Sequence, residues 1–283
     1  MPLRLARRFG RAAGLLLYKI WASRRRIAVA NIREAIGRGA LETGSAAEKI
    51  AEDCFKNLGE SFIEIIKIYS GLDRKIMGGI TFRGLENFEA PRSARRGIIF
   101  VTAHAGNWEL LALASSVKFG KIDVIARPLK NPYLNGLLER IRGHYGNEVV
   151  YKQGALRRML KTLKSGGMTG ILMDQAVLRD EGHIVEFLGR GAWTTKMPAV
   201  MGKRTRAALL PIFIKRKNGG HEIDIYPEVP VEGTEEEVLL RLNRKIGEHI
   251  RENPEEWLWI HRRWKRVPGA GAAAATPPAP LLS

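Results

Sequence analysis

Residues 98–116, IIFVTAHAGNWELLALASS, decide the fold of this chain. The short apolar run at 98–101 is typical of a strand that is covered on both faces of a sheet. Ala105 and Gly106 end this run, and Asn107 is a good N-cap for the apolar helix that follows. The stretch therefore predicts a buried strand, a tight turn and a helix.

Two polar residues in this stretch are candidate catalytic groups. His104 lies at the carboxyl end of the predicted strand, and Glu109 lies in the first turn of the helix. Open α/β sheets bind ligands at that edge, where a carboxylate can orient a histidine that acts as a base. The alternative is structural, with His104 as a hydrogen-bonded core residue and Glu109 as a partner for the helix dipole.

A length of 283 residues is enough for one large α/β domain or two small ones with a substantial core, and the composition, 45% hydrophobic and 27% charged, is ordinary for a globular protein. The charge balance is unusual, since 47 Lys and Arg against 29 Asp and Glu give a net charge of +18. Such a charge attracts acidic proteins, anionic lipids or nucleic acid. The single cysteine, Cys54, excludes an internal disulfide and a thiolate zinc site, and its apolar helical surroundings favour a buried structural role.

Strand and helix patterns alternate after residue 98, which predicts an α/β fold with a central, mostly parallel sheet and helices on both faces. Before this region we expect a core-covering helix over 45–70, opened by a capping box of Ser45 and Glu48. A polar loop is expected over 89–97, and a turn over 189–191 after a strand that ends at residue 188. Thr234 and Glu237 form a second expected capping box.

The domain organisation follows from charge and composition. Residues 1–44 are predicted to form a basic amphipathic membrane-association segment, because residues 1–33 hold nine Lys and Arg and no acid around the apolar run 12–22. That run is too short to span a bilayer, which needs about 20 apolar residues. The alternative is a basic helix docked on the domain. Residues 45–267 form the predicted α/β domain, and 268–283 a disordered Ala/Pro tail.

Polar residues follow two further strands. Arg127 follows the strand over 122–126, and Asp174 and Gln175 follow the strand over 169–173. Parallel strands would bring them to the same edge as His104. A neutral His104 can remove a hydroxyl proton while Glu109 holds the other ring nitrogen, and Arg127 is suited to bind phosphate or to stabilise an oxyanion.

Several other chemistries are excluded by the sequence. It has no G-x-S-x-G elbow, no Walker phosphate loop and no G-x-G-x-x-G motif. The remaining histidines show no metal-ligand spacing, so we expect no metal and no cofactor. The basic residues form no recognised nucleic-acid motif, so a nucleic-acid partner is not expected.

The residues from His104 to Glu109 resemble the H-x4-[D/E] motif of the glycerolipid acyltransferase superfamily. The form His-Ala-Gly-Asn-Trp-Glu is similar to its bacterial lipid A biosynthesis branch, the lauroyl/myristoyl acyltransferases. The similarity runs over about 8–265. It includes Arg127-Pro128, Met173-Asp174-Gln175, Phe187-Leu-Gly-Arg190 with Thr194-Thr195, and 257–264.

The resemblance implies transfer of a fatty acyl chain from acyl carrier protein to a hydroxyl of a lipid A precursor, at the cytoplasmic face of the cell inner membrane. It implies a catalytic His104 and Glu109, and substrate binding by Arg127, Asp174, Gln175 and Arg190. One alternative is an acyltransferase for another anionic glycolipid, such as a phosphatidylinositol mannoside. A second, from another class, is a non-catalytic basic protein that binds membrane or nucleic acid.

Overall fold

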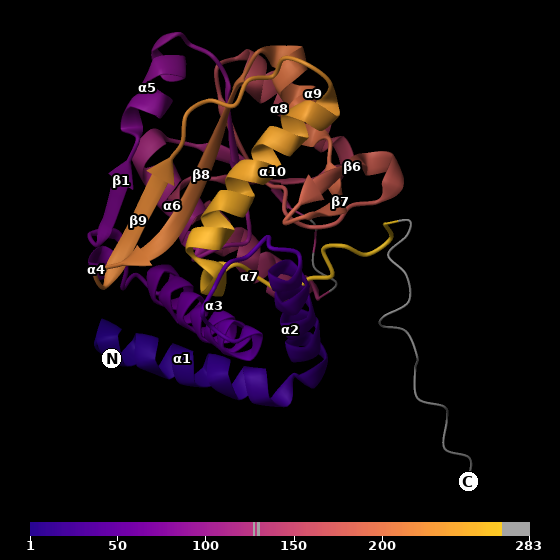
Figure 1. Ribbon diagram of the computed structural model, residues 1–283. Coiled ribbons are helices and arrows are strands. Elements are labelled where there is room, and N and C mark those ends of the chain that lie inside the picture. The colour runs from indigo at the N-terminus through magenta and orange to yellow at the C-terminus, as the bar shows by residue number, and fades with distance from the viewer. Residues whose placement is uncertain (127, 129–130, 268–283) are drawn as a thin grey trace.

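The computed structural model describes residues 1–126, 128 and 131–267 of the chain. In this part of the chain seven strands form one sheet in the order β1-β9-β8-β2-β5-β3-β4 (Figure 1). The strands are β1 (Ile80–Arg83), β2 (Ile98–Thr102), β3 (Ile122–Ala126), β4 (Glu148–Tyr151), β5 (Met168–Leu172), β8 (Ala208–Lys217) and β9 (Gly220–Ile225). Only β9 and β1 run against the others, so the predicted mostly parallel sheet is confirmed.

The central strand β2 separates two hydrophobic clusters, because its side chains alternate between the faces of the sheet. Ile98 and Phe100 belong to one cluster and Ile99 and Val101 to the other. The first is covered by α5 (Leu85–Ser93), α6 (Trp108–Phe119) and α7 (Pro132–Arg142), and the second by α8 (Lys152–Lys164), α9 (Met197–Thr205) and α10 (Glu235–Glu252). Helices on both faces explain why every residue of β2 is buried.

A separate antiparallel pair of strands, β6 (Gly182–Phe187) and β7 (Arg190–Thr195), packs against α10 beside the sheet. The expectation of a turn over 189–191 is therefore wrong for Arg190 and Gly191, which pair with Phe187 and Glu186. The turn itself is Leu188-Gly189, where both residues have positive φ.

Two further expectations are corrected by local packing. The expected loop over 89–97 begins as α5, since burial of Phe88 and Pro91 against the core outweighs the polar composition. Ser45 does not cap α3 (Ala47–Tyr69), whose N-cap is Ala46, because the Ser45 N–H donates to Thr43 Oγ1 in a turn outside the helix. The capping box at the start of α10 and the Asn107 cap of α6 are confirmed.

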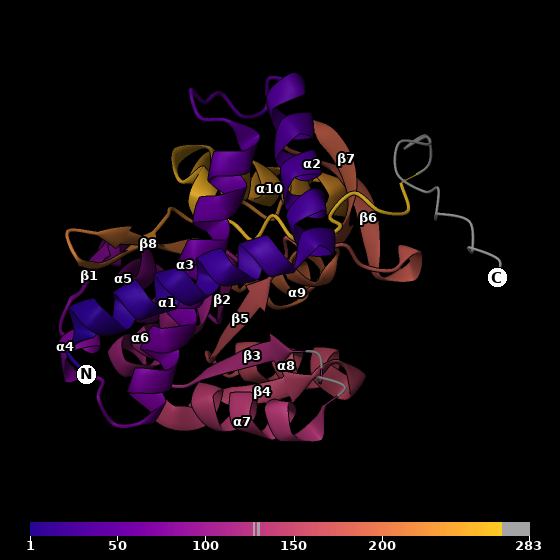
Figure 2. The same ribbon diagram turned by 90° about the horizontal axis from the view of Figure 1, so that it is seen from below.

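The N-terminal helices α1 (Leu3–Ile20) and α2 (Ala22–Gly37) pack on α3, and Figure 2 shows α1 lying across it. Gly10 and Gly14 of α1 meet Gly59 of α3 with the two backbones in direct contact. This side of α3 is therefore buried. Phe62 and Ile66 are 64% and 41% exposed, so these two apolar residues of the predicted core-covering helix lie outside the core. The predicted tail at 268–283 lies outside the described residues.

The remaining short elements are α4 (Arg74–Met77), η1 (Gly143–Tyr145), η2 (Arg179–Glu181) and η3 (Pro254–Glu256). None of the helices in the described ranges combines the length and the apolar character that crossing a membrane requires.

Replacing Gly14 by Ala is expected to loosen α1 from α3. A Cβ at this position would lie 2.1 Å from the Phe55 carbonyl oxygen. Since backbone cannot yield as a side chain can, we expect a cost of about 1–3 kcal/mol. Thermal unfolding measures this loss, and limited trypsin digestion would show earlier cleavage within α1.

The matched control is Gly37→Ala in α2, where nothing lies within 4 Å of the added methyl group. Alanine is the better helix former, so this variant should be unchanged or more stable by up to about 1 kcal/mol. Equal melting temperatures for the two variants would contradict the close packing of α1 on α3.

Candidate active site

His104 and Asp174 meet at the carboxyl edge of the sheet. The register of the parallel strands β2 and β5 pairs Thr102 with Leu172, so each of the two polar residues lies two positions beyond a paired strand end. The Nδ1 atom of His104 lies 2.8 Å from Asp174 Oδ1, and the His104 main-chain N–H donates to Oδ2 over 3.1 Å. The expected convergence of these two strand ends is confirmed.

Asp174 is buried, with 2% of its surface exposed, and a third donor completes its surroundings. Trp257 Nε1 donates to Oδ2 over 2.8 Å. Burial alone raises the pKa of the Asp174 carboxyl, but the charge of His104 and the hydrogen bonds outweigh it and lower the pKa to about 2. The carboxylate is therefore ionised at neutral pH, so Nδ1 carries a proton and Nε2 of a neutral His104 is an acceptor.

The second ring nitrogen of His104, Nε2, has a different neighbour. Its Nε2 lies 3.3 Å from the side-chain nitrogen of Gln175, which is suited to donate to it. The Trp108 ring packs edge-on against the imidazole, with 5.2 Å between centroids. The side chain of His104 is still 21% exposed, so the ring is not sealed in the core.

Glu109 does not hold the imidazole, and this sequence-based prediction is wrong. Its two carboxylate oxygens accept hydrogen bonds from Nε and Nη2 of Arg142 on α7, over 2.9 Å and 2.6 Å. The acceptor of the Nδ1 proton is Asp174. Glu109 is close to His104 along the chain, but it lies on the helix that leaves the turn, whereas Asp174 extends from the adjacent parallel strand.

The turn that carries His104 is fixed by main-chain contacts. Gly106 has φ of 59°, and a Cβ there would lie 2.2 Å from the Ile214 carbonyl oxygen. Its N–H donates to the Glu256 carbonyl over 2.9 Å, and the His104 carbonyl accepts the Leu258 N–H over the same distance. The segment after α10 therefore holds the turn that carries His104 by hydrogen bonds at two positions.

The buried carboxylate of Glu64 on α3 holds Asn107, the residue that follows Gly106 in the turn. Glu64 is fully buried and accepts hydrogen bonds from Asn107 Nδ2 at 2.9 Å, Arg216 Nη1 at 2.9 Å, His221 Nε2 at 3.1 Å and Arg7 Nε at 2.7 Å. Burial raises the pKa of Glu64, but His221 and Arg216 outweigh it and hold the pKa well below its ordinary value. Asn107 therefore joins the start of α6 to an ionised anchor.

Of the two predicted arginines, only Arg190 can be placed in the described structure. Arg127 lies outside the described residues. Arg190 starts β7 and forms an ion pair with Glu34 of α2, with 2.5 Å between Nη1 and Oε1. This pairing gives Arg190 a structural contact and does not support the predicted role in substrate binding.

Two residues that the sequence analysis missed, Trp257 and Glu64, support the site from distant segments. A signal exists for Glu64, because it falls on the same helix stripe as Cys54, Ser61 and Ile68, which are all buried. A carboxylate on a buried stripe must be paired with cations or hydrogen-bond donors. No comparable signal identifies Trp257 as a donor to Asp174.

Cys54 is a structural residue, as expected. Burial raises the pKa of its thiol to about 12, and its Sγ donates to the Trp257 carbonyl over 3.1 Å. A thiol held neutral in this way is a poor nucleophile. In the described ranges no group of three or more His, Cys, Asp and Glu side chains could hold a metal ion.

The fold and the site define a class of enzyme. A histidine that is oriented by a buried carboxylate at the carboxyl edge of a parallel sheet is suited to activate a hydroxyl for group transfer. Residues 1–266 match the family model of the bacterial lipid A biosynthesis acyltransferases, and the chain belongs to this family. It is therefore an acyltransferase, which decides against the non-catalytic alternative.

Curated relatives agree with this assignment. The chain is 27% identical over 252 residues to the lipid A biosynthesis palmitoleoyltransferase of Escherichia coli K12, covering 83% of this chain and 80% of that protein. It is 26% identical over 252 residues to the lipid A biosynthesis lauroyltransferase of the same organism, covering 87% and 74%. It is 24% identical over 185 residues to the phosphatidylinositol mannoside acyltransferase of Mycobacterium tuberculosis H37Rv, covering 64% and 58%.

The two carboxylates can be distinguished by substitution. Asp174→Asn should lower kcat for acyl transfer by roughly 10³–10⁴-fold, because an amide no longer fixes the tautomer of His104 or stabilises its charged form. Glu109→Gln should lower kcat only as much as Arg142→Met does. The Glu109→Gln/Arg142→Met double variant should lower kcat no further.

This double-mutant cycle separates a role through Arg142 from a role on the histidine. If Glu109→Gln keeps its full effect on kcat in the Arg142→Met background, Glu109 acts on the reaction independently of the ion pair. Melting temperatures of all the variants exclude loss of the fold as the cause.

Proposed function

We propose that this enzyme transfers a fatty acyl chain from acyl carrier protein to a hydroxyl of a lipid A precursor. The observation that carries the proposal is the contact between Asp174 and Nδ1 of His104, which leaves Nε2 available at an exposed edge. The family and the names of its Escherichia coli members support the acceptor class.

The proposed reaction is a single displacement. Nε2 of His104 takes the proton of the acceptor hydroxyl, and the oxygen attacks the carbonyl carbon of the thioester. Asp174 stabilises the imidazolium that forms. Collapse of the tetrahedral intermediate breaks the carbon–sulfur bond, and the imidazolium returns the proton to the leaving thiolate. The products are an ester and the free thiol of the carrier.

Gln175 would change its hydrogen-bond partner when the acceptor binds. Its amide lies near Nε2 in the free enzyme and is suited to move onto the incoming hydroxyl or the neighbouring polar groups. Arg127, which follows β3 in the sequence, keeps its proposed role as a phosphate or oxyanion ligand.

A second acceptor is favoured by one comparison. The similarity to a mycobacterial phosphatidylinositol mannoside acyltransferase supports an anionic glycolipid other than lipid A as the alternative.

The donor is supported by charge, since a protein of net charge +18 attracts an acidic carrier protein.

Mass spectrometry of lipid A tests the reaction in cells. Cells that lack the protein should accumulate a lipid A precursor lighter by one acyl group, and the wild-type gene should restore the missing mass. His104→Ala should not restore it, because no base then activates the hydroxyl. Full restoration by His104→Ala would refute the proposed base, and an unchanged lipid A with altered glycolipids would favour the second acceptor.

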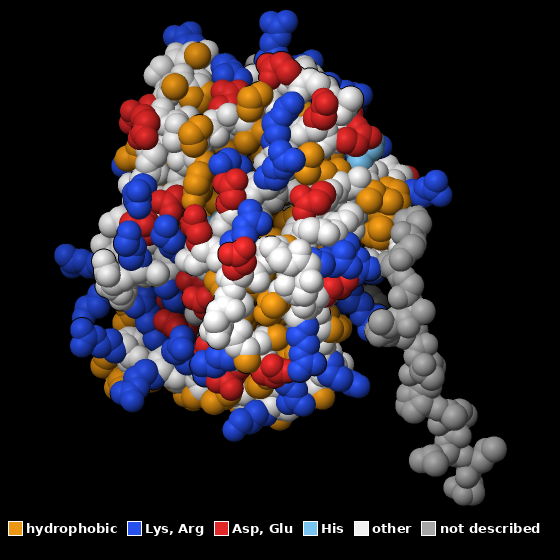
Figure 3. Space-filling view, in the orientation of Figure 1, with side chains coloured by type: hydrophobic (Ala, Val, Ile, Leu, Met, Phe, Trp, Pro, Cys, Tyr) orange, Lys and Arg blue, Asp and Glu red, His pale blue; other side chains and the backbone are white. Residues whose placement is uncertain are grey.

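We also propose that α1 attaches the enzyme to the cytoplasmic face of the inner membrane. Its outer side carries the exposed apolar residues Leu5, Phe9, Leu16 and Ile20, which are 51–68% exposed and recur on one stripe. Basic residues flank this stripe, and Figure 3 shows orange and blue side chains together along the lower edge, where α1 lies in Figure 1. Such a helix is typical of interfacial attachment.

Vesicle binding tests this attachment. The double variant Phe9→Ser/Leu16→Ser should bind vesicles that contain phosphatidylglycerol at least roughly tenfold more weakly than the wild type. The reason is that it removes apolar area that would be buried in the membrane interface. The control is Val117→Ser on α6, where an equally exposed apolar residue (58%) lies on another element. Equal loss for both variants, or for neither, would contradict attachment through α1.

A further inference from the structure

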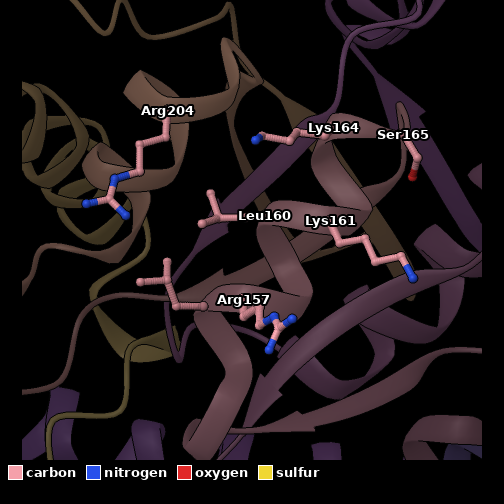
Figure 4. A pocket seen from close by; sticks show the side chains of 7 residues that line it. Arg157, Leu160, Lys161, Lys164, Ser165 and Arg204 are labelled. Atoms are coloured by element: carbon pink, nitrogen blue, oxygen red, sulfur yellow. The ribbon is translucent and has the colours of Figure 1, made fainter.

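Arg263, in the segment after α10, carries a charge that is completely buried, since none of its surface is exposed. Surface arginines such as Arg157 and Arg204, which border the open pocket in Figure 4, keep their charge in contact with water. The guanidinium of Arg263 donates instead to two neutral oxygens, the Trp193 carbonyl over 2.5 Å and Thr194 Oγ1 over 2.6 Å. Its Nε has no hydrogen-bond partner among the described residues. A buried charge without hydration is costly, so a counter-charge is expected nearby.

The negative charge that acts on Arg263 is that of Asp174, and two aromatic rings connect the two groups. Cζ of Arg263 lies 4.7 Å from the centre of the Phe187 ring. Phe187 packs on Trp257 with 5.5 Å between ring centroids, and Nε1 of Trp257 donates to Asp174 Oδ2 over 2.8 Å. Both rings are 1% exposed. The contacts therefore run from the guanidinium to the catalytic carboxylate through the buried core.

This separation by apolar side chains keeps the two charges coupled. Charges in the core act over longer distances than charges in water, because neither solvent nor salt screens them. Burial lowers the pKa of the Arg263 guanidinium to about 10, and the negative charge of Asp174 opposes this shift. Arg263 is therefore protonated at neutral pH, and its positive charge acts on the pair formed by Asp174 and His104.

The other titratable groups around this pair come from the same segment. His261 interacts with both Asp174 and His104, but burial lowers its pKa to about 4, so it is neutral at neutral pH. Lys265, which acts on His261, is exposed, and solvent screens its charge. Among the described residues around the pair, Arg263 is thus the cation that is both fixed and fully buried.

The elements packed against Arg263 contribute neutral groups. The β6–β7 hairpin supplies the ring of Phe187 and the hydroxyl of Thr194. Helix α10 supplies Asn243, whose Nδ2 donates to Thr194 Oγ1 over 3.3 Å. These contacts fix the position of the guanidinium without neutralising it.

We propose that Arg263 is a positioning residue that acts through Asp174, and that its buried charge keeps His104 in the neutral form that accepts the hydroxyl proton. A cation beside the pair favours the ionised carboxylate and opposes the uptake of a further proton by the pair. The inference rests on the proposed function, since it takes His104 as the base and Asp174 as its partner. It adds a residue that sets the pH range in which this base is available.

Removing the charge tests this role. Arg263→Gln keeps an amide donor for Thr194 and the Trp193 carbonyl but has no charge. The acidic limb of kcat/KM, for transfer from an acyl carrier protein thioester to a lipid A precursor, should move to higher pH by roughly half a unit to one unit. On the alkaline side of this limb kcat/KM should stay within roughly threefold of the wild type, because the pair is deprotonated there in both proteins.

Two variants that keep the charge are the controls. Arg263→Lys retains a cation, and Thr194→Val removes only the oxygen that accepts from Arg263. Both should lower the melting temperature and leave the acidic limb where the wild type has it. A limb that stays in place in Arg263→Gln, or that moves equally in Arg263→Lys, would overturn the proposal. If Arg263→Gln does not fold, a shifted limb in Arg263→Lys alone contradicts a role of the charge, and an unshifted one supports it.

A readout without substrate separates this inference from the proposed function. Diethylpyrocarbonate modifies neutral imidazole, so its rate of reaction at His104, located by peptide mass spectrometry, follows the neutral fraction of the ring. The pH dependence of this rate should show the same shift in Arg263→Gln. A shift in an enzyme that transfers no acyl group from the carrier would refute the proposed donor and keep the role of Arg263. Acyl transfer with no shift by either readout would keep the proposed function and refute the role of Arg263.

Discussion

The hydrogen bond between the buried carboxylate of Asp174 and Nδ1 of His104 is the interaction on which the rest of the structure depends. Taking a carboxylate out of water is costly unless charges and donors replace the lost hydration. Here the replacement comes from the ring and main chain of His104 and from Trp257. The chain after α10 crosses the sheet edge and supplies this last donor from Trp257. The same segment then fixes the catalytic turn through Leu258.

Chain order and spatial order give different answers for the partner of His104. The strand patterns alone place His104 and Asp174 at one edge, because parallel strands of equal length end together. They do not say which of two carboxylates takes Nδ1, and closeness along the chain favoured Glu109. The register decides for Asp174, since Thr102 opposite Leu172 puts residues 104 and 174 side by side. Such a register follows from packing of the whole sheet and is not encoded in either strand.

The supports of the turn were harder to predict for a related reason. Glu64 and Trp257 lie 43 and 83 residues from the side chains they hold, Asn107 and Asp174. Local patterns identify helix α3 and the tryptophan-rich segment, but their side-chain contacts arise only when α3, β8 and the C-terminal segment meet. Stability and catalysis are joined here, because the charges that satisfy Glu64 also hold the first turn of α6 in place.

Helix α3 lies between the proposed membrane contact and the chemistry. On one side its Gly59 lies against α1, and on the other its Glu64 and Cys54 hold Asn107 and the Trp257 carbonyl. Arg7 of α1 reaches the same Glu64 carboxylate, so α1 and the catalytic turn share one buried anion.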